Sequence, residues 1–180
     1  MAIKNKMQKQ KSAIGDKNGF ALLIAVIFMS VMLSLGLALS ALGYKQQVLA
    51  SAAIASQYAF YAADAGMECA LYADQKQNLF DYASHDQNNQ PAAAACDDAL
   101  ATVPPGGYSY DSERLSLTMR FSLDAGTSHP RCADVTIYKY GAPQGEGITT
   151  NIFSQGYDVS CAALNAGVAR YVSRGINSHY

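Results

Sequence analysis

Four cysteines and three histidines are the side chains of this 180-residue chain that most readily bind metal ions or act as nucleophiles. No two cysteines form a Cys-x-x-Cys pair, which argues against a zinc ribbon or a thioredoxin-like redox motif. His129 precedes Cys132 by three residues, but one such pair is far short of a metal site. The sequence therefore predicts no metal centre and no cofactor.

The motifs of common enzyme classes do not occur in this sequence. It contains no Gly-x-Ser-x-Gly elbow, no phosphate-binding glycine loop and no His-Glu-x-x-His pair. Aspartates gather between residues 77 and 107, but their spacing lacks the alternating oxygen ligands of a calcium loop. We therefore expect a protein without enzymatic activity, whose function lies in binding or assembly.

The longest apolar stretch lies near the N-terminus. Residues 20–43 contain no charge, no proline and no amide side chain. As an α-helix this stretch would be roughly 36 Å long, against a hydrocarbon core of about 30 Å. A backbone in lipid must satisfy its own hydrogen bonds, so a helix is the expected state. We predict a membrane-spanning helix over residues 20–44.

A basic leader, residues 1–19, precedes this helix. It holds five of the 13 basic residues and one of the 14 acidic ones, so the remainder of the chain is net acidic and a poor non-specific binder of nucleic acid. Positive charge before the first apolar segment keeps the N-terminus in the cytoplasm. We expect an inner-membrane (cytoplasmic-membrane) protein with its C-terminal part outside. The apolar run is too long for a signal-peptide core, and no small-x-small cleavage pattern closes it.

Residues 45–77 continue the helical pattern with two stripes. The bulkier stripe includes Leu49, Phe60 and Met67, and the stripe of small residues includes Ala52 and Gly66. Two stripes could bury two faces of the helix, one on the rest of the chain and one on neighbouring helices. A plain amphipathic helix that covers a sheet, and needs only the bulkier stripe, is the alternative.

The pattern in the rest of the chain predicts a loop followed by strands. Residues 78–107 lack periodicity and carry turn-forming residues, which predicts a connecting loop. In residues 108–180, apolar and polar side chains alternate from Leu115 to Leu123, and further strands are expected at 108–111, 132–140, 149–160 and 168–178. We predict an α+β fold, with a long N-terminal helix packed on a four- or five-stranded antiparallel sheet.

Gly19 and Phe20 stand where the basic leader meets the apolar helix. A leader of this kind, followed by glycine, phenylalanine and a long apolar helix, resembles the class III signal of type IV prepilins. In that family a prepilin peptidase cuts after the glycine and methylates the new N-terminus. The resemblance implies a mature chain that begins at Phe20 and keeps its helix. The Ala-Phe-Tyr-Ala-Ala-Asp-Ala block at residues 59–65 looks like minor pilins of the PilX type.

This resemblance implies the pilin "lollipop" fold and a structural subunit of a type IV pilus. Its helix would leave the membrane and pack with other pilin subunits in an extracellular filament, assembled by a pilus platform and motor, in support of adhesion, motility or DNA uptake. Small residues that would permit close helix packing are Ser30, Ser34, Gly36, Ser40 and Gly43. The resemblance does not say which surface or DNA ligand the subunit binds.

Ile24 departs from the family pattern. Pilins commonly carry a glutamate at this position, which pairs with the N-terminal amine of a neighbouring subunit. An amine in an apolar core without that carboxylate is costly. A first-assembled subunit has no such neighbour, so Ile24 favours a minor subunit at the tip or the initiating position. A type II secretion pseudopilin and an uncleaved membrane-anchored extracellular domain are the alternatives.

The predicted topology exports all four cysteines to an oxidising compartment, where disulfides are expected. Three pairings are possible. We favour Cys69–Cys96, which would pin the aspartate-rich loop to the helix, and Cys132–Cys161, which would link two strands or their loops. The second pair resembles the C-terminal disulfide region of pilins. Four free, buried cysteines are the alternative.

Overall fold

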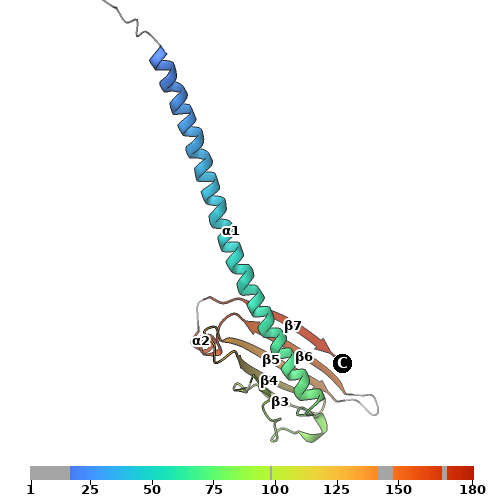
Figure 1. The fold of residues 1–180 in the computed structure, drawn as a ribbon. Helices are drawn as coiled ribbons and strands as arrows, with labels where there is room; N and C mark the ends of the chain where they lie inside the picture. The colour runs from blue at the N-terminus through green and yellow to red at the C-terminus, as the bar shows by residue number, and fades with distance from the viewer. Residues whose placement is uncertain (1–16, 98, 142–147, 168–169) are drawn as a thin grey trace, which may run out of the picture. The chain divides into compact units, whose positions relative to one another are not determined.

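The computed structural model describes residues 17–97, 99–141, 148–167 and 170–180 (Figure 1). The chain divides into two compact units, with the boundary between Val48 and Leu49. The described part of the first unit is helical throughout, and the second unit holds the end of the same helix and the strands. The predicted α+β fold is confirmed, because one long helix packs on a five-stranded antiparallel sheet.

Helix α1 extends from Lys17 to Gln75 without a break. It begins two residues before Gly19, so the end of the expected leader is helical, and it ends close to the predicted end at residue 77. No proline interrupts this stretch. After the helix, Asn78 has a φ of 51°, the left-handed conformation in which helices commonly end.

The sheet contains β3 to β7 in chain order, with each strand antiparallel to the next. The strands are Tyr108–Tyr110 (β3), Arg114–Leu123 (β4), Arg131–Tyr140 (β5), Thr149–Tyr157 (β6) and Ser173–His179 (β7). Along β4 and β5 buried side chains alternate with half-buried ones, as the period of two in the sequence predicts. One face of the sheet therefore carries the core, and we call the other its outer face.

The predicted strand at 149–160 is too long. Strand β6 ends at Tyr157, and a short helix α2 follows at Cys161–Asn165. Ser160 caps this helix, because its Oγ accepts a hydrogen bond from the backbone N–H of Ala163 at 3.1 Å. Strand β7 begins at Ser173, later than the predicted residue 168, and residues 168–169 lie outside the described part.

The segment predicted as a loop at 78–107 contains short regular elements. They are a 3₁₀ turn η1 at Tyr82–Ser84 and a small hairpin of β1 (Ala95–Cys96) and β2 (Ala99–Leu100). Thr102 then pairs with Arg120 of β4. Since the backbone of this segment is anchored to the sheet, the segment folds as part of the second unit.

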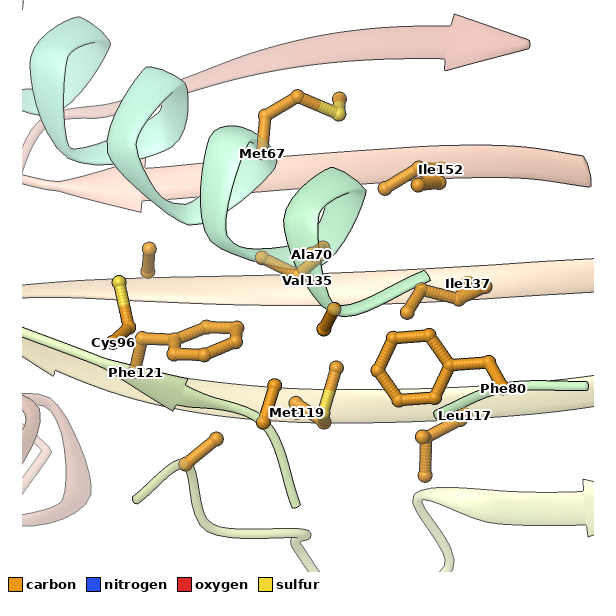
Figure 2. Packing of buried hydrophobic residues seen from close by; sticks show 14 of the residues in the cluster. Met67, Ala70, Phe80, Cys96, Leu117, Met119, Phe121, Val135, Ile137 and Ile152 are labelled. Carbon is orange, nitrogen blue, oxygen red and sulfur yellow. The ribbon is translucent and has the colours of Figure 1, made fainter. Parts of the chain in front are cut away.

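The core of the second unit lies between the last part of α1 and the inner sheet face (Figure 2). Strands β4 and β5 contribute Leu117, Met119 and Val135, which are fully buried. Phe80, from the segment after α1, is also fully buried in this cluster. Burial of each such side chain contributes about 1.5–3 kcal/mol to stability, so the long connection helps to hold the fold together.

Candidate assembly helix

The apolar side chains in the N-terminal half of α1 are not buried within the chain. Every described side chain from Gly19 to Ala50 is exposed. Phe20 and Leu33 are 68% and 69% exposed. By length and composition alone, this helix could cross a membrane. Ser30 and Ser34 donate their hydroxyl protons to the carbonyl oxygens of Ile27 and Val31 at 2.8 Å, so both polar groups are satisfied within the helix.

The small residues predicted for helix packing occupy more than one side of α1. At 3.6 residues per turn, Ser30 and Ser34 share one side, while Gly36, Ser40 and Gly43 share another. A Cβ added at Gly36 or Gly43 would meet nothing within 4 Å. Ile24 is half exposed in the same helix. The helix therefore offers two separate tracks of small residues.

In the second unit, small residues of α1 form the face that lies on the sheet. These residues, each no more than 1% exposed, are Ala59, Ala62, Ala63, Ala70 and Ala73. Gly156 of β6 is the point of closest approach, since a Cβ there would lie 2.2 Å from Ala59 O and from Ala63 N. Ser154 Oγ donates a hydrogen bond to the Ala63 carbonyl at 2.6 Å. The helix backbone thus rests almost directly on β6.

This docking corrects the simpler of the two sequence interpretations, in which the bulkier stripe alone faces the sheet. Met67 of that stripe is buried, but Leu49 and Phe60 are 69% and 45% exposed. The small stripe enters the interface because Gly156 leaves room only for a helix face without large side chains. Gly66 lies over Val135 in the same interface.

Large side chains instead line one flank of this part of α1. We call Ile54, Tyr58, Tyr61 and Tyr72 the outward stripe; their exposure lies between 43% and 59%. The spacing of the first three, four and then three residues, keeps them in one row along the helix. The guanidinium of Arg131 lies 4.5 Å from the centre of the Tyr58 ring. A second helix would meet a row of aromatic rings here.

Both favoured disulfides are present. Cys69–Cys96 joins α1 to the β1–β2 hairpin, and Cys132–Cys161 joins β5 to α2. No described cysteine is free. The four cysteines predicted to be exported are thus all consumed in cross-links within the second unit.

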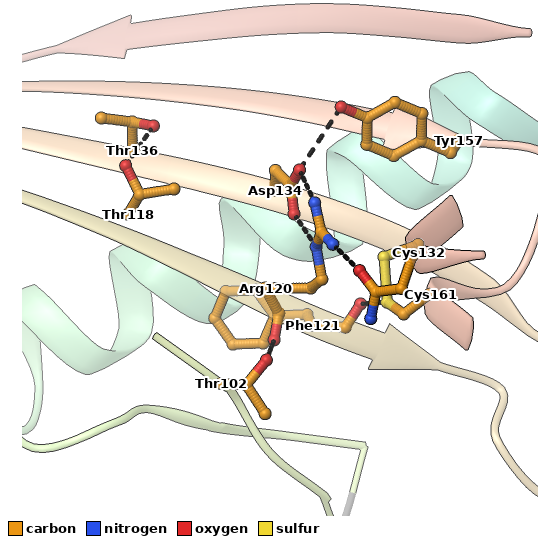
Figure 3. A network of polar contacts seen from close by, with 10 residues as sticks. Thr102, Thr118, Arg120, Phe121, Cys132, Asp134, Thr136, Tyr157 and Cys161 are labelled. Carbon is orange, nitrogen blue, oxygen red and sulfur yellow. Dashed lines mark hydrogen bonds and ion pairs between the residues drawn. A yellow bond between two sulfur atoms is a disulfide. The ribbon is translucent and has the colours of Figure 1, made fainter. Parts of the chain in front are cut away.

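A polar network on the outer sheet face holds α2 in place (Figure 3). Arg120 of β4 donates two hydrogen bonds to the carboxylate of Asp134 on β5, at 2.6 and 2.7 Å, and a further one to Asn165 in α2. The Asp134 carboxylate raises the pKa of Arg120 above its ordinary value. Burial raises the pKa of Tyr157, whose hydroxyl reaches the same carboxylate at 3.4 Å, to about 12.

Aspartates of the connecting segment and of the turn between β3 and β4 cap turns. Asp81 accepts a hydrogen bond from the Ser84 hydroxyl at 2.6 Å, which lowers the pKa of that carboxyl. Asp111 accepts from the backbone N–H groups of Glu113 and Arg114, which lowers its pKa as well. Among the residues that the structure describes, no three His, Cys, Asp or Glu side chains are grouped to hold a metal ion.

Comparisons with protein-family models, with curated proteins and with solved structures give no match. The geometry described above is therefore the basis on which a function can be argued. Its main parts are the exposed apolar half of α1, the close docking of the other half and the two disulfides. The sequence had pointed to the helix and the cysteines, but the Gly156 contact was missed, although a glycine inside a strand can mark the close approach of another backbone.

Proposed function

We propose that this chain is a structural subunit of a type IV pilus, cut by prepilin peptidase after Gly19 and assembled through α1. One observation carries the proposal: α1 is continuous, yet its apolar side chains over residues 20–43 are exposed. Exposed apolar surface of this extent marks contact with a membrane or with other proteins. A pilin makes both contacts in turn, first with the inner membrane and then with other subunits in the extracellular filament.

The proposed role is structural, and the features of the second unit suit it. Two disulfides and a close helix–sheet contact favour a rigid exported body. Ile24 supports a minor subunit at the tip or at the initiating position, where no preceding subunit offers an amine to neutralise. Its partners would be other pilin subunits, the prepilin peptidase and the pilus platform and motor.

The N-terminal mass of the protein from cell envelopes, with and without prepilin peptidase, tests this proposal. We expect a chain that begins at methylated Phe20 only when the peptidase is present. A Gly19→Leu variant should stay uncut, whereas Gly36→Leu, which changes a glycine further along the same helix, should still be processed. An intact N-terminus in the presence of the peptidase, or a cut near residues 41–43, would contradict the proposal and leave an anchored or secreted domain.

Cleavage after Gly19 would not distinguish a type IV pilin from a type II secretion pseudopilin, because both undergo the same processing. Filaments sheared from the cell surface make that distinction. We expect the protein in the sheared pilus fraction, and its loss there when the assembly motor of the pilus is removed. Loss only with a secretion system would favour the pseudopilin.

A further inference from the structure

We propose that Lys139 of β5 and Asp74 at the end of α1 form a covalent cross-link, in which the lysine amine and the aspartate carboxyl condense to a side-chain amide. The inference starts from their position. Lys139 Nζ lies 2.6 Å from Asp74 Oδ1, and the two side chains are only 9% and 3% exposed. The bond would tie the helix to the middle strand of the sheet, whether or not the chain assembles into a filament.

The two side chains of the pair are largely shielded from solvent. On β4, the residue opposite Lys139 is Leu115, which is fully buried, and Ala73 beside Asp74 is 1% exposed. Two opposite charges without water lose more hydration than their attraction returns, unless good hydrogen bonds compensate. An amide carries no charge, and the water that its formation releases goes to bulk solvent. Burial therefore favours the condensed form over the ion pair.

The geometry of this contact differs from that of the ion pair on the outer sheet face. In the Arg120–Asp134 pair, Nε donates a true hydrogen bond at 2.6 Å. Among the described residues, by contrast, none donates a hydrogen bond to Asp74 Oδ1, although Lys139 Nζ is just as close. The amine and the carboxyl group are thus in direct contact.

Tyr180 supplies the group that such a reaction needs. Its hydroxyl donates a hydrogen bond to Asp74 Oδ2, the other carboxylate oxygen, at 2.5 Å. Burial raises the pKa of Tyr180, so the phenol keeps its proton and remains a donor. A fixed donor stabilises negative charge that develops on a carbonyl oxygen during attack at the carbon. The backbone of Tyr180 is held by two hydrogen bonds to Thr150.

The reaction balances without any further reactant. A proton passes from the Lys139 ammonium to Asp74 Oδ1, which leaves a neutral amine and a carboxylic acid. Nζ attacks Cγ, the new C–N bond forms, and the C–Oδ1 bond breaks. Oδ1 leaves as water with two protons that came from Nζ, and Oδ2 stays as the amide oxygen. Reacting groups that are held close together and aligned can react as if at about 10⁵–10⁸ M, and the contact between Lys139 and Asp74 supplies the closeness.

The test is the mass of the full-length chain, purified in detergent, reduced and alkylated. We expect it to be lower than the sequence requires by one water molecule. Trypsin should then release residues 46–76 joined to residues 132–170, because Lys139 no longer offers a cleavage site. A full mass, with 46–76 and 132–139 as separate peptides, would overturn the proposal and leave an ion pair.

Three variants assign the loss of water to these residues. Lys139→Arg should restore the full mass, and persistence of the loss in that variant would overturn the assignment. Lys76→Arg, at an exposed lysine near Asp74 in sequence, should keep the cross-link. Tyr180→Phe should form it about 10²-fold more slowly after a pulse of synthesis, since it removes one donor. An unchanged rate would rule out the role given to Tyr180. The wild-type masses decide the main question even if a variant fails to fold.

Discussion

At the scale of single residues, Gly156 determines how closely α1 approaches the sheet. Its missing side chain lets the backbone of α1 at Ala59 and Ala63 lie against β6, and Ser154 adds a hydrogen bond beside it. The neighbouring helix face is built from alanines, which have no rotamer freedom to lose on burial. Close backbone contact thus replaces interlocking side chains in this interface.

This arrangement predicts the effect of a single methyl group. Gly156→Ala would place a Cβ 2.2 Å from two backbone atoms of α1, which cannot move aside as a side chain could. We expect the helix to be displaced and the free energy of unfolding to fall by roughly 1–3 kcal/mol, measured by thermal unfolding monitored by circular dichroism. Gly126→Ala, where the added Cβ meets nothing within 4 Å, is the control. Equal melting temperatures for both variants would contradict the proposed role of Gly156.

At the scale of elements, periodicity predicted α1 and the long strands well. The alternation at 115–123 and the unbroken helical pattern to residue 75 are local signals that the fold preserves. Helix α2 was missed because five residues show less than two turns of any period. The docking face of α1 was also beyond local reasoning, since it depends on Gly156, far away in the chain. The Asp74–Lys139 contact escaped prediction for the same reason.

The two disulfides stabilise different elements, which gives a matched pair of variants. Replacing Cys69 and Cys96 by alanine should free the segment between α1 and β1, and replacing Cys132 and Cys161 should free α2. Each loss should lower the stability by about 3–4 kcal/mol in the chain-entropy model. Limited proteolysis with mapping of the cut sites should place the new cuts at 77–95 in the first variant and at 158–167 in the second. Identical cut sites would show that the disulfides do not act locally.

At the scale of the whole molecule, the proposed filament requires α1 to offer a surface to other subunits. The outward stripe supplies aromatic area within the second unit, along an exposed flank of the helix. Rings of this kind contribute strongly to interfaces, because they bury a large area for few rotatable bonds. The stripe should therefore be covered in an assembled filament.

A charge in the outward stripe should separate folding from assembly. Tyr61 is 59% exposed, so Tyr61→Lys should change stability by less than about 0.5 kcal/mol and yet exclude the protein from sheared filaments. Tyr140→Lys places the same charge on β5 at a residue that is 39% exposed, and should leave incorporation intact. Comparison of sheared and cell-bound fractions by immunoblot measures both. Equal incorporation of the two variants would show that the outward stripe is not part of the assembly surface.

The disulfides also limit how far this protein can stretch under load. Cys69–Cys96 joins residues 27 positions apart in the chain, and Cys132–Cys161 joins residues 29 positions apart. An extended chain reaches about 3.3–3.6 Å per residue, so the two loops together hide roughly 190 Å of contour length. Tension applied between the start of α1 and Tyr180 would bypass both loops until a sulfur–sulfur bond is reduced. Even after its sheet unravels, the second unit would therefore extend roughly 190 Å less than the same chain without disulfides.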